Sequence, residues 1–116
     1  MQERYYASVS GALTLAGYSK NEPERAASMI RSGIAEHVFI ENENGNRAVI
    51  LFEGSSMPYS EAGVKELLDS IKGCCAEGRL EFCGEDRELW CLRYDPERGE
   101  WVRLSGHIVY EECLQT

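Results

Sequence analysis

The sequence predicts an α+β domain in which two helices pack against an antiparallel sheet. Three observations support this class: two segments carry apolar residues at helical spacing, several carry them at alternate positions, and turn-forming residues separate the segments. The expected element order is β-α-β-β-α-β-β-β. The first six elements follow the order of a split βαβ, or ferredoxin-like, unit, which the last two would extend as a C-terminal β-hairpin.

One long first strand is expected over residues 5–18. Apolar side chains alternate both before and after Gly11. A single strand bent at Gly11 is favoured over two short strands joined by a turn at Ser10 and Gly11.

A helix is expected over residues 21–33. Asn21 can act as its N-cap, Pro23 suits the first turn, and Glu24 occupies the position that closes a capping box. Gly33 predicts the end of the helix. The apolar stripe that would face the core consists of Ala26, Ala27, Met29 and Ile30.

Residues 37–53 predict a β-hairpin, because two apolar runs flank Asn44-Gly45, a pair that favours tight turns. Pairing from that turn places four apolar residues on one face: Val38, Ile40, Val49 and Leu51. The other face then carries Phe39, Ile50 and Phe52. Apolar residues on both faces indicate strands well inside a sheet.

Residues 54–59 are expected to form a loop that leads into a second helix. Ser60 predicts the N-cap, Glu61 lies in the first turn, where the helix dipole favours an acid, and Gly73 predicts the end. The stripe at helical spacing consists of Val64, Leu67, Leu68 and Ile71.

The remainder predicts three consecutive strands, at about residues 79–83, 88–94 and 100–111. A turn at residues 95–99, with a proline and a glycine, joins the last two. Alternation along the middle strand puts one set on one face, Trp90, Leu92 and Tyr94, and another set on the opposite face, Leu89 and Cys91.

The length of 116 residues fits one globular domain that spans residues 1–116. The longest unbroken apolar run, from Ala48 to Phe52, is far shorter than the roughly 20 residues of a membrane span. The first residues lack the apolar stretch of a signal peptide. We therefore expect a soluble, cytoplasmic protein that does not bind membranes.

The five cysteines are odd in number and form no Cys-x-x-Cys pair, which predicts free thiols rather than disulfides. Zinc ligation by Cys74, Cys75, Cys83 and His107 is disfavoured, because the paired ligand spacing of a structural zinc site is missing. We expect no metal and no cofactor. The expected place for the remaining cysteines is the core, as small apolar residues; these are Cys83, Cys91 and Cys113.

The sequence favours a non-enzymatic protein, since no catalytic set is evident. His37 and His107 are the only histidines, and neither lies in a motif that pairs a nucleophile with a base. Acidic residues gather near residues 81–88 and at the C-terminal end. A solvated turn and tail explains them better than the paired carboxylates of a glycosidase.

The formal net charge of −8 is concentrated in the second half of the chain. Residues 59–116 carry thirteen acids and seven bases, whereas residues 1–58 carry seven acids and five bases. A negative surface repels nucleic-acid phosphates, so direct nucleic-acid binding is not expected.

Two features are candidate binding sites. The final hairpin carries Trp90, Tyr94, Trp101 and Arg103, and such aromatic and arginine residues either stabilise a sheet or anchor an interface. Stacking of Trp101 on a neighbouring arginine is expected there. The loop Gly54–Tyr59 carries Ser55 and Ser56 before a helix N-terminus, where an anion could bind.

The leading hypothesis is a non-enzymatic protein-binding module with an unknown protein partner or with self-association as a homodimer. The second is an acidic inhibitor that mimics nucleic acid, of the anti-defence type. The third is a small ligand-binding domain or enzyme that uses the Gly54–Tyr59 loop.

Overall fold

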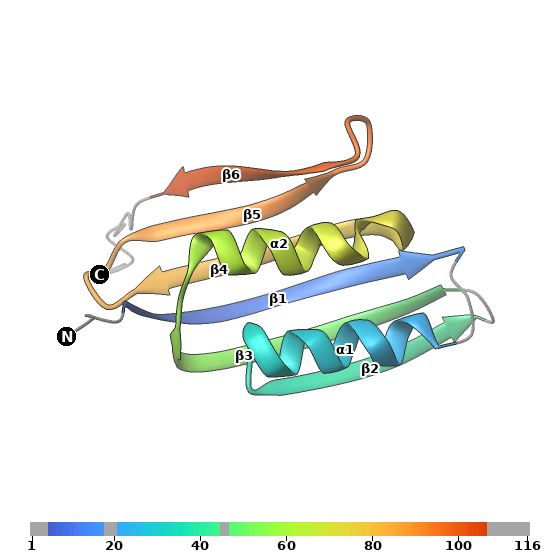
Figure 1. Ribbon diagram of the computed structural model, residues 1–116, viewed down its shortest axis with the longest axis horizontal. Coiled ribbons are helices and arrows are strands. Elements are labelled where there is room, and N and C mark those ends of the chain that lie inside the picture. Colours follow the sequence, from blue (N-terminus) through green and yellow to red (C-terminus); the bar gives the residue numbers. More distant parts are fainter. Residues whose placement is uncertain (1–4, 18–20, 45–46, 107–116) are drawn as a thin grey trace, which may run out of the picture.

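The computed structural model describes residues 5–17, 21–44 and 47–106 (Figure 1). Its elements, in chain order, are β1 (Tyr6–Ala16), α1 (Glu22–Gly33), β2 (His37–Asn44), β3 (Arg47–Pro58), α2 (Glu61–Ile71), a 3₁₀ turn η1 (Lys72–Cys74), β4 (Cys75–Gly84), β5 (Leu89–Asp95) and β6 (Glu100–Gly106). The α+β class with two helices is confirmed. No helix within these ranges is long and apolar enough to cross a membrane.

The six strands form one antiparallel sheet in the order β2-β3-β1-β4-β5-β6. The first strand of the chain therefore lies at the centre, with Leu13 paired to Ile50 on one side and Gly78 on the other. The expectation of one continuous first strand is confirmed. Its glycine permits close packing, because a Cβ at Gly11 would lie 2.5 Å from the carbonyl oxygen of Arg79.

Both helices cover the same face of the sheet, and no described element covers the other face (Figure 1). The core lies between the helices and the covered face. The expected stripe of α1 is buried at Ala26, Ala27 and Ile30, and that of α2 at Val64, Leu68 and Ile71. The strands contribute alternate residues, among them Leu13, Leu15, Ile50, Leu80 and Leu92.

The helix N-termini differ from each other. Ser60 caps α2 as expected, since its Oγ accepts a hydrogen bond from the backbone N–H of Gly63 at 3.2 Å. Asn21 occupies the expected N-cap position of α1, but its side chain makes no capping hydrogen bond. The backbone of Asn21, at φ −105° and ψ 4°, is not in the extended conformation that capping side chains prefer.

The predicted pairing register of the β2–β3 hairpin is wrong by one residue, and the predicted assignment of its side chains to the two faces is therefore wrong. Asn44 pairs with Arg47, and the pairing register of β2 and β3 then shifts between Asn44 and Asn42. A one-residue shift moves every side chain to the opposite face. The covered face consequently carries Val38, Ile40, Ile50 and Phe52, and the uncovered face carries Phe39, Val49 and Leu51. Gly45 of the expected turn lies outside the described residues.

Residues 54–58 belong to β3 and are not the expected loop. A register shift between β1 and β3 accommodates an extra residue near Ser55 and Ser56, and Ser56 has a positive φ of 53°. β4 begins earlier than expected, at Cys75. The turn after β5 is confirmed, with the N–H of Gly99 donating to the carbonyl of Asp95 at 2.8 Å. The expected continuation of β6 over residues 107–111 lies outside the described residues.

Candidate functional site

The aromatic residues of the final hairpin lie on the covered face of the sheet. Trp90 is 4% exposed and stacks on Phe82, with ring centroids 5.3 Å apart and an interplanar angle of 6°. Its indole Nε1 donates a hydrogen bond to the hydroxyl of Tyr59 at 3.1 Å. Trp90 is thus part of the core beneath the N-terminal end of α2.

Trp101 and Tyr94 pack against each other with ring centroids 5.5 Å apart. Trp101 is half-buried and lies over Gly78, whose missing Cβ would be 2.4 Å from the indole ring. The expected stacking on arginine involves a different tryptophan, because the guanidinium of Arg103 lies 5.4 Å from the centre of the Trp90 ring. Arg103 also forms an ion pair with Glu61 at 3.2 Å. These contacts join β6 to α2.

Ser55 and Ser56 lie within β3, several residues before the N-terminus of α2. The backbone N–H of Ser55 donates to the carboxylate of Glu36 at 3.2 Å, so an acid already occupies that donor. Ser55 instead lines a hollow on the uncovered face. The structure therefore separates Ser55 from the four hairpin residues with which the sequence had grouped it as a binding candidate.

The uncovered face carries the three large apolar residues that are exposed in the described part of the chain. Phe39 is 61% exposed, Leu104 is 41% exposed and Leu51 is 37% exposed. They share this face because Phe39 pairs with Leu51 across β2 and β3, and because Leu104 pairs with Cys91 across β6 and β5. Phe39 and Leu51 adjoin each other on one flank of the face and Leu104 lies on the opposite flank. Exposed apolar side chains that adjoin one another are typical of interaction surfaces.

A row of polar and reactive side chains crosses the same face from strand to strand. His37 pairs with Glu53, Glu53 with Ser10, Ser10 with Glu81, and Glu81 with Cys91. Residues that are paired directly across neighbouring strands point to the same face. The row therefore brings an imidazole, two carboxylates and a hydroxyl to one surface.

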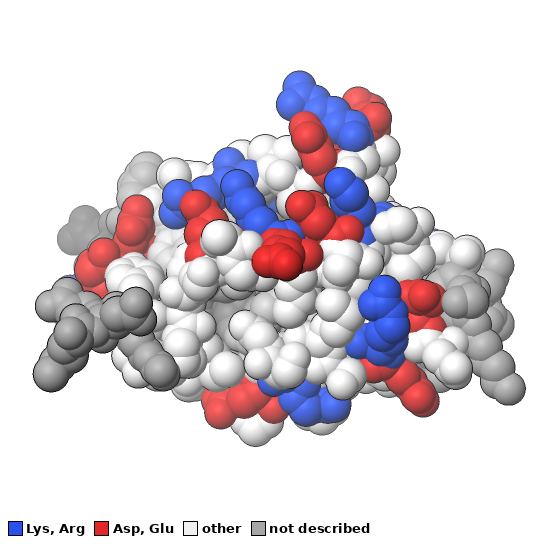
Figure 2. Space-filling model, viewed as in Figure 1, with Lys and Arg blue, Asp and Glu red and all other residues white. Residues whose placement is uncertain are grey.

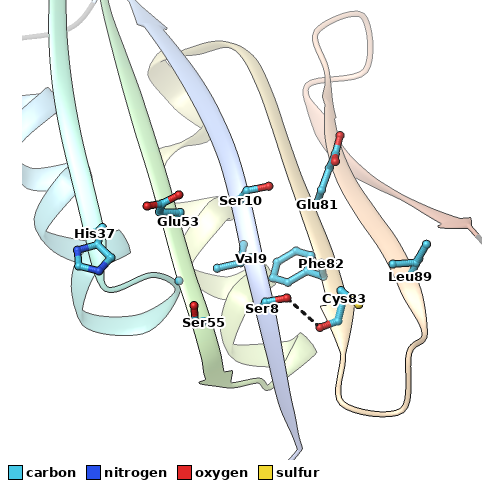
Figure 3. A pocket seen from close by; sticks show the side chains of 11 residues that line it. Ser8, Val9, Ser10, His37, Glu53, Ser55, Glu81, Phe82, Cys83 and Leu89 are labelled. Carbon is cyan, nitrogen blue, oxygen red and sulfur yellow. Dashed lines mark hydrogen bonds between the residues drawn. The ribbon is translucent and has the colours of Figure 1, made fainter. Parts of the chain in front are cut away.

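A shallow hollow of about 460 Å³ lies beside this row (Figure 3). Small side chains on the central strand, Ser8 and Ser10, form its floor, and Figure 3 shows Glu53 and Glu81 on the strands to either side. Ser8 donates a hydrogen bond to the carbonyl oxygen of Cys83 at 3.4 Å. The hollow offers hydroxyl and carboxylate groups, and its open shape resembles a docking surface more than an enclosed active site.

Two arginines face each other on the uncovered face. Arg79 pairs with Arg93 across β4 and β5, an arrangement in which like charges oppose each other. The positive charge of Arg79 is paired with the carboxylate of Glu81, with Nε and Oε1 2.8 Å apart. Arg93 makes no ion pair with another residue of the described ranges, so its charge is available to an acidic group of a partner.

The four cysteines of the described ranges do not gather into a site. Within the described ranges no group of three or more His, Cys, Asp or Glu side chains is placed to hold a metal ion. Cys75 and Cys83 lie at opposite ends of β4, and Cys91 is buried. Burial raises the pKa of the Cys75 thiol to about 12 and also raises that of Cys74, which disfavours the reactive thiolate form. His107 and Cys113 lie outside the described residues.

The exposed apolar residues were absent from the sequence-based candidates. The alternation of apolar residues predicts that Phe39 and Leu51 lie on strands, but the predicted register, which is wrong by one residue, placed them on opposite faces.

Comparison of the chain with protein-family models, with curated proteins and with solved structures finds no match. The surface chemistry of the uncovered face is therefore the basis for inferring function.

Proposed function

We propose that this protein is a non-enzymatic protein-binding module and that the uncovered sheet face is its binding surface. The observation that carries the proposal is the location of Phe39, Leu51 and Leu104, which are exposed together on the one face that no described element covers. Interfaces combine apolar side chains with polar and charged ones. The row from His37 to Cys91 and the two arginines supply the polar part.

Site-directed photo-crosslinking tests this proposal. A photoreactive phenylalanine derivative is placed at position 39 or 104 of the full chain, and at exposed Ala62 on α2 as the matched control. Irradiation in an extract of the source cells should give discrete protein adducts from positions 39 and 104, but not from position 62. Equal labelling from all three positions, or none from positions 39 and 104, would contradict a binding role for this face.

The strand order also supports a more detailed proposal about the fold. We infer that β1 to β4 and the two helices form a split βαβ, or ferredoxin-like, core, which the hairpin of β5 and β6 extends. The element order β-α-β-β-α-β and the antiparallel pairing of the four strands support it. Such a core by itself implies no activity. The free state of the four described cysteines fits a cytoplasmic protein in a reducing compartment.

A nucleic-acid mimic is less well supported. Such a protein needs acidic groups in a continuous row, whereas Figure 2 shows acidic and basic side chains interspersed on the helix-covered face. On the uncovered face, Arg79 and Arg93 interrupt the acids of β3 and β4.

A small polar ligand in the hollow is the second candidate function. The specific observation in its favour is the convergence of Ser8, Ser10 and Ser55 with Glu53 and Glu81 around about 460 Å³. Carboxylates and hydroxyls suit a cationic or polyhydroxylated molecule. Thermal-shift measurements with spermidine and with simple sugars test it, and an unchanged melting temperature with each of them would remove it.

A further inference from the structure

Resting on the proposed function, we infer that the partner of the uncovered face is a second copy of this chain. The two sheets would pack face to face about a two-fold axis that runs parallel to the strands, between β1 and β4. Such a dimer is a sandwich of two sheets about 10 Å apart, with the helices on its outer surfaces.

The first argument is the distribution of apolar residues along the strand order. One flank of the uncovered face, on β2 and β3, carries Phe39 and Leu51, and the other flank, on β5 and β6, carries Leu104 and the half-buried Val102. The strands between them carry mainly polar residues. A two-fold axis between β1 and β4 lays the β2–β3 flank of one copy on the β5–β6 flank of the other. Each apolar flank is thereby covered, as an isologous interface requires.

The second argument is charge complementarity in the same arrangement. Successive cross-strand pairs place Arg93 on β5 at the same level of the sheet as Leu51 on β3, and Glu53 lies two residues further along β3. When β5 of one copy lies over β3 of the other, the guanidinium of Arg93 comes within reach of Glu53. The interaction occurs twice by symmetry, and it gives Arg93 the acidic partner that it lacks among the described residues of its own chain.

The third argument is size. Six strands spaced about 4.8 Å apart, with seven residues each at about 3.3 Å, present roughly 650 Å² per copy. Stable specific interfaces bury about 600–1,000 Å² per partner. The face is therefore large enough for a stable dimer without any contribution from the helices. The hollows over Ser8 and Ser10 would face each other and hold interfacial water, which is usual in such contacts.

The test is analytical ultracentrifugation of the full chain over a wide concentration range. Wild-type protein should sediment as a dimer with a measurable dissociation constant. Leu104→Glu and Phe39→Glu should each raise this constant by about 10- to 100-fold, the effect of losing one buried large side chain. Ala62→Glu, which adds the same charge on the exposed surface of α2, should leave it unchanged.

A charge exchange separates a loss of association from a loss of folding. Glu53→Arg should weaken the dimer, and Glu53→Arg combined with Arg93→Glu should restore it. Circular dichroism should be the same for all variants. Recovery in the double variant supports the two-fold packing, whereas an additive loss would refute the Arg93–Glu53 contact and with it this geometry.

Failure of this inference is distinguishable from failure of the proposed function. A wild-type monomer at all concentrations, with photo-crosslinks from positions 39 and 104 to a different protein, would overturn self-association and preserve the binding role. A monomer that gives no adducts from these positions would overturn both. A dimer that is insensitive to every uncovered-face variant would place the interface elsewhere.

Discussion

Tyr59 and Trp90 show how one hydrogen bond fixes the aromatic part of the core. The Trp90 ring is enclosed by Phe82, Tyr59 and the guanidinium of Arg103, and its indole N–H is directed at the Tyr59 hydroxyl. A buried N–H that loses its acceptor costs more than the hydrogen bond itself contributes. The position of Tyr59, between β3 and α2, makes this contact the junction of the sheet with the second helix.

Tyr59→Phe is expected to lower the free energy of unfolding by about 1–3 kcal/mol, because the ring contacts persist while the Trp90 N–H is left without an acceptor. Chemical denaturation followed by tryptophan fluorescence measures the change. Tyr94→Phe is the matched control, since the Tyr94 hydroxyl forms no hydrogen bond with other described residues, and its effect should stay within about 0.5 kcal/mol. Equal losses in both variants would argue against this role for the hydroxyl.

The two helices provide a comparison of capping at the scale of elements. The α2 cap is a formed hydrogen bond from Gly63 to Ser60, whereas Asn21 precedes α1 without one. Ser60→Ala should therefore destabilise the protein by about 0.5–2 kcal/mol. Asn21→Ala should cost less, and thermal unfolding of the two variants side by side checks the order. A larger loss from Asn21→Ala would contradict the described cap geometry.

The β2–β3 hairpin shows where prediction from the sequence stops. The two strands and the turn region are evident from alternation and from Asn44-Gly45, but the register is not. Ile50 and Phe52 alternate with Val49 and Leu51, so both faces of β3 are apolar. Either register would therefore place apolar side chains on the covered face, and the sequence does not distinguish the two. The helices decide the register by covering one face. Ser55 and Ser56 were misassigned for a related reason: polar residues in a bulged strand resemble a loop.

The final hairpin shows the same limit for the candidate site. The alternation of Trp90, Leu92 and Tyr94 was predicted correctly, but not which face the helices cover. That choice depends on the path of the chain from β1 through α1 to β2 and from β3 through α2 to β4. Right-handed crossovers put both helices on the same side, so this rule was the signal that one face of the sheet stays uncovered.

At the scale of the whole molecule, the first described residue is bound to a distant turn. The Tyr5 hydroxyl donates a hydrogen bond to the carboxylate of Asp86, which also accepts the N–H of Glu88 at 3.1 Å. The bond from Tyr5 lowers the pKa of Asp86, and partial burial followed by this bond raises the pKa of Tyr5. The chain start and the β4–β5 turn are thus coupled through two titrating groups.

This coupling predicts how stability depends on pH. The lowered pKa of Asp86 contributes stability above about pH 4, and this contribution is lost as the pH falls through the folded-state pKa. The raised pKa of Tyr5 contributes stability below about pH 10, and this contribution is lost as the pH rises further. The stability difference between wild type and Tyr5→Phe should be constant between these limits and shrink beyond each. Denaturant titrations across pH measure it, and a difference that is constant at all pH values would disprove the coupling.

The central position of β1 has a consequence for how the protein is made. Ribosomes add residues from the N-terminus at about 5–20 per second, so β1 emerges roughly 3 to 14 s before the end of β4 is synthesised. β3 can cover one edge of β1 earlier, but the other edge has no cognate strand until Gly84 has been added. A nascent chain would therefore hold an unpaired inner strand edge, the kind of edge that recruits other chains. Chaperone protection during synthesis should matter more for this strand order than for one built from successive hairpins.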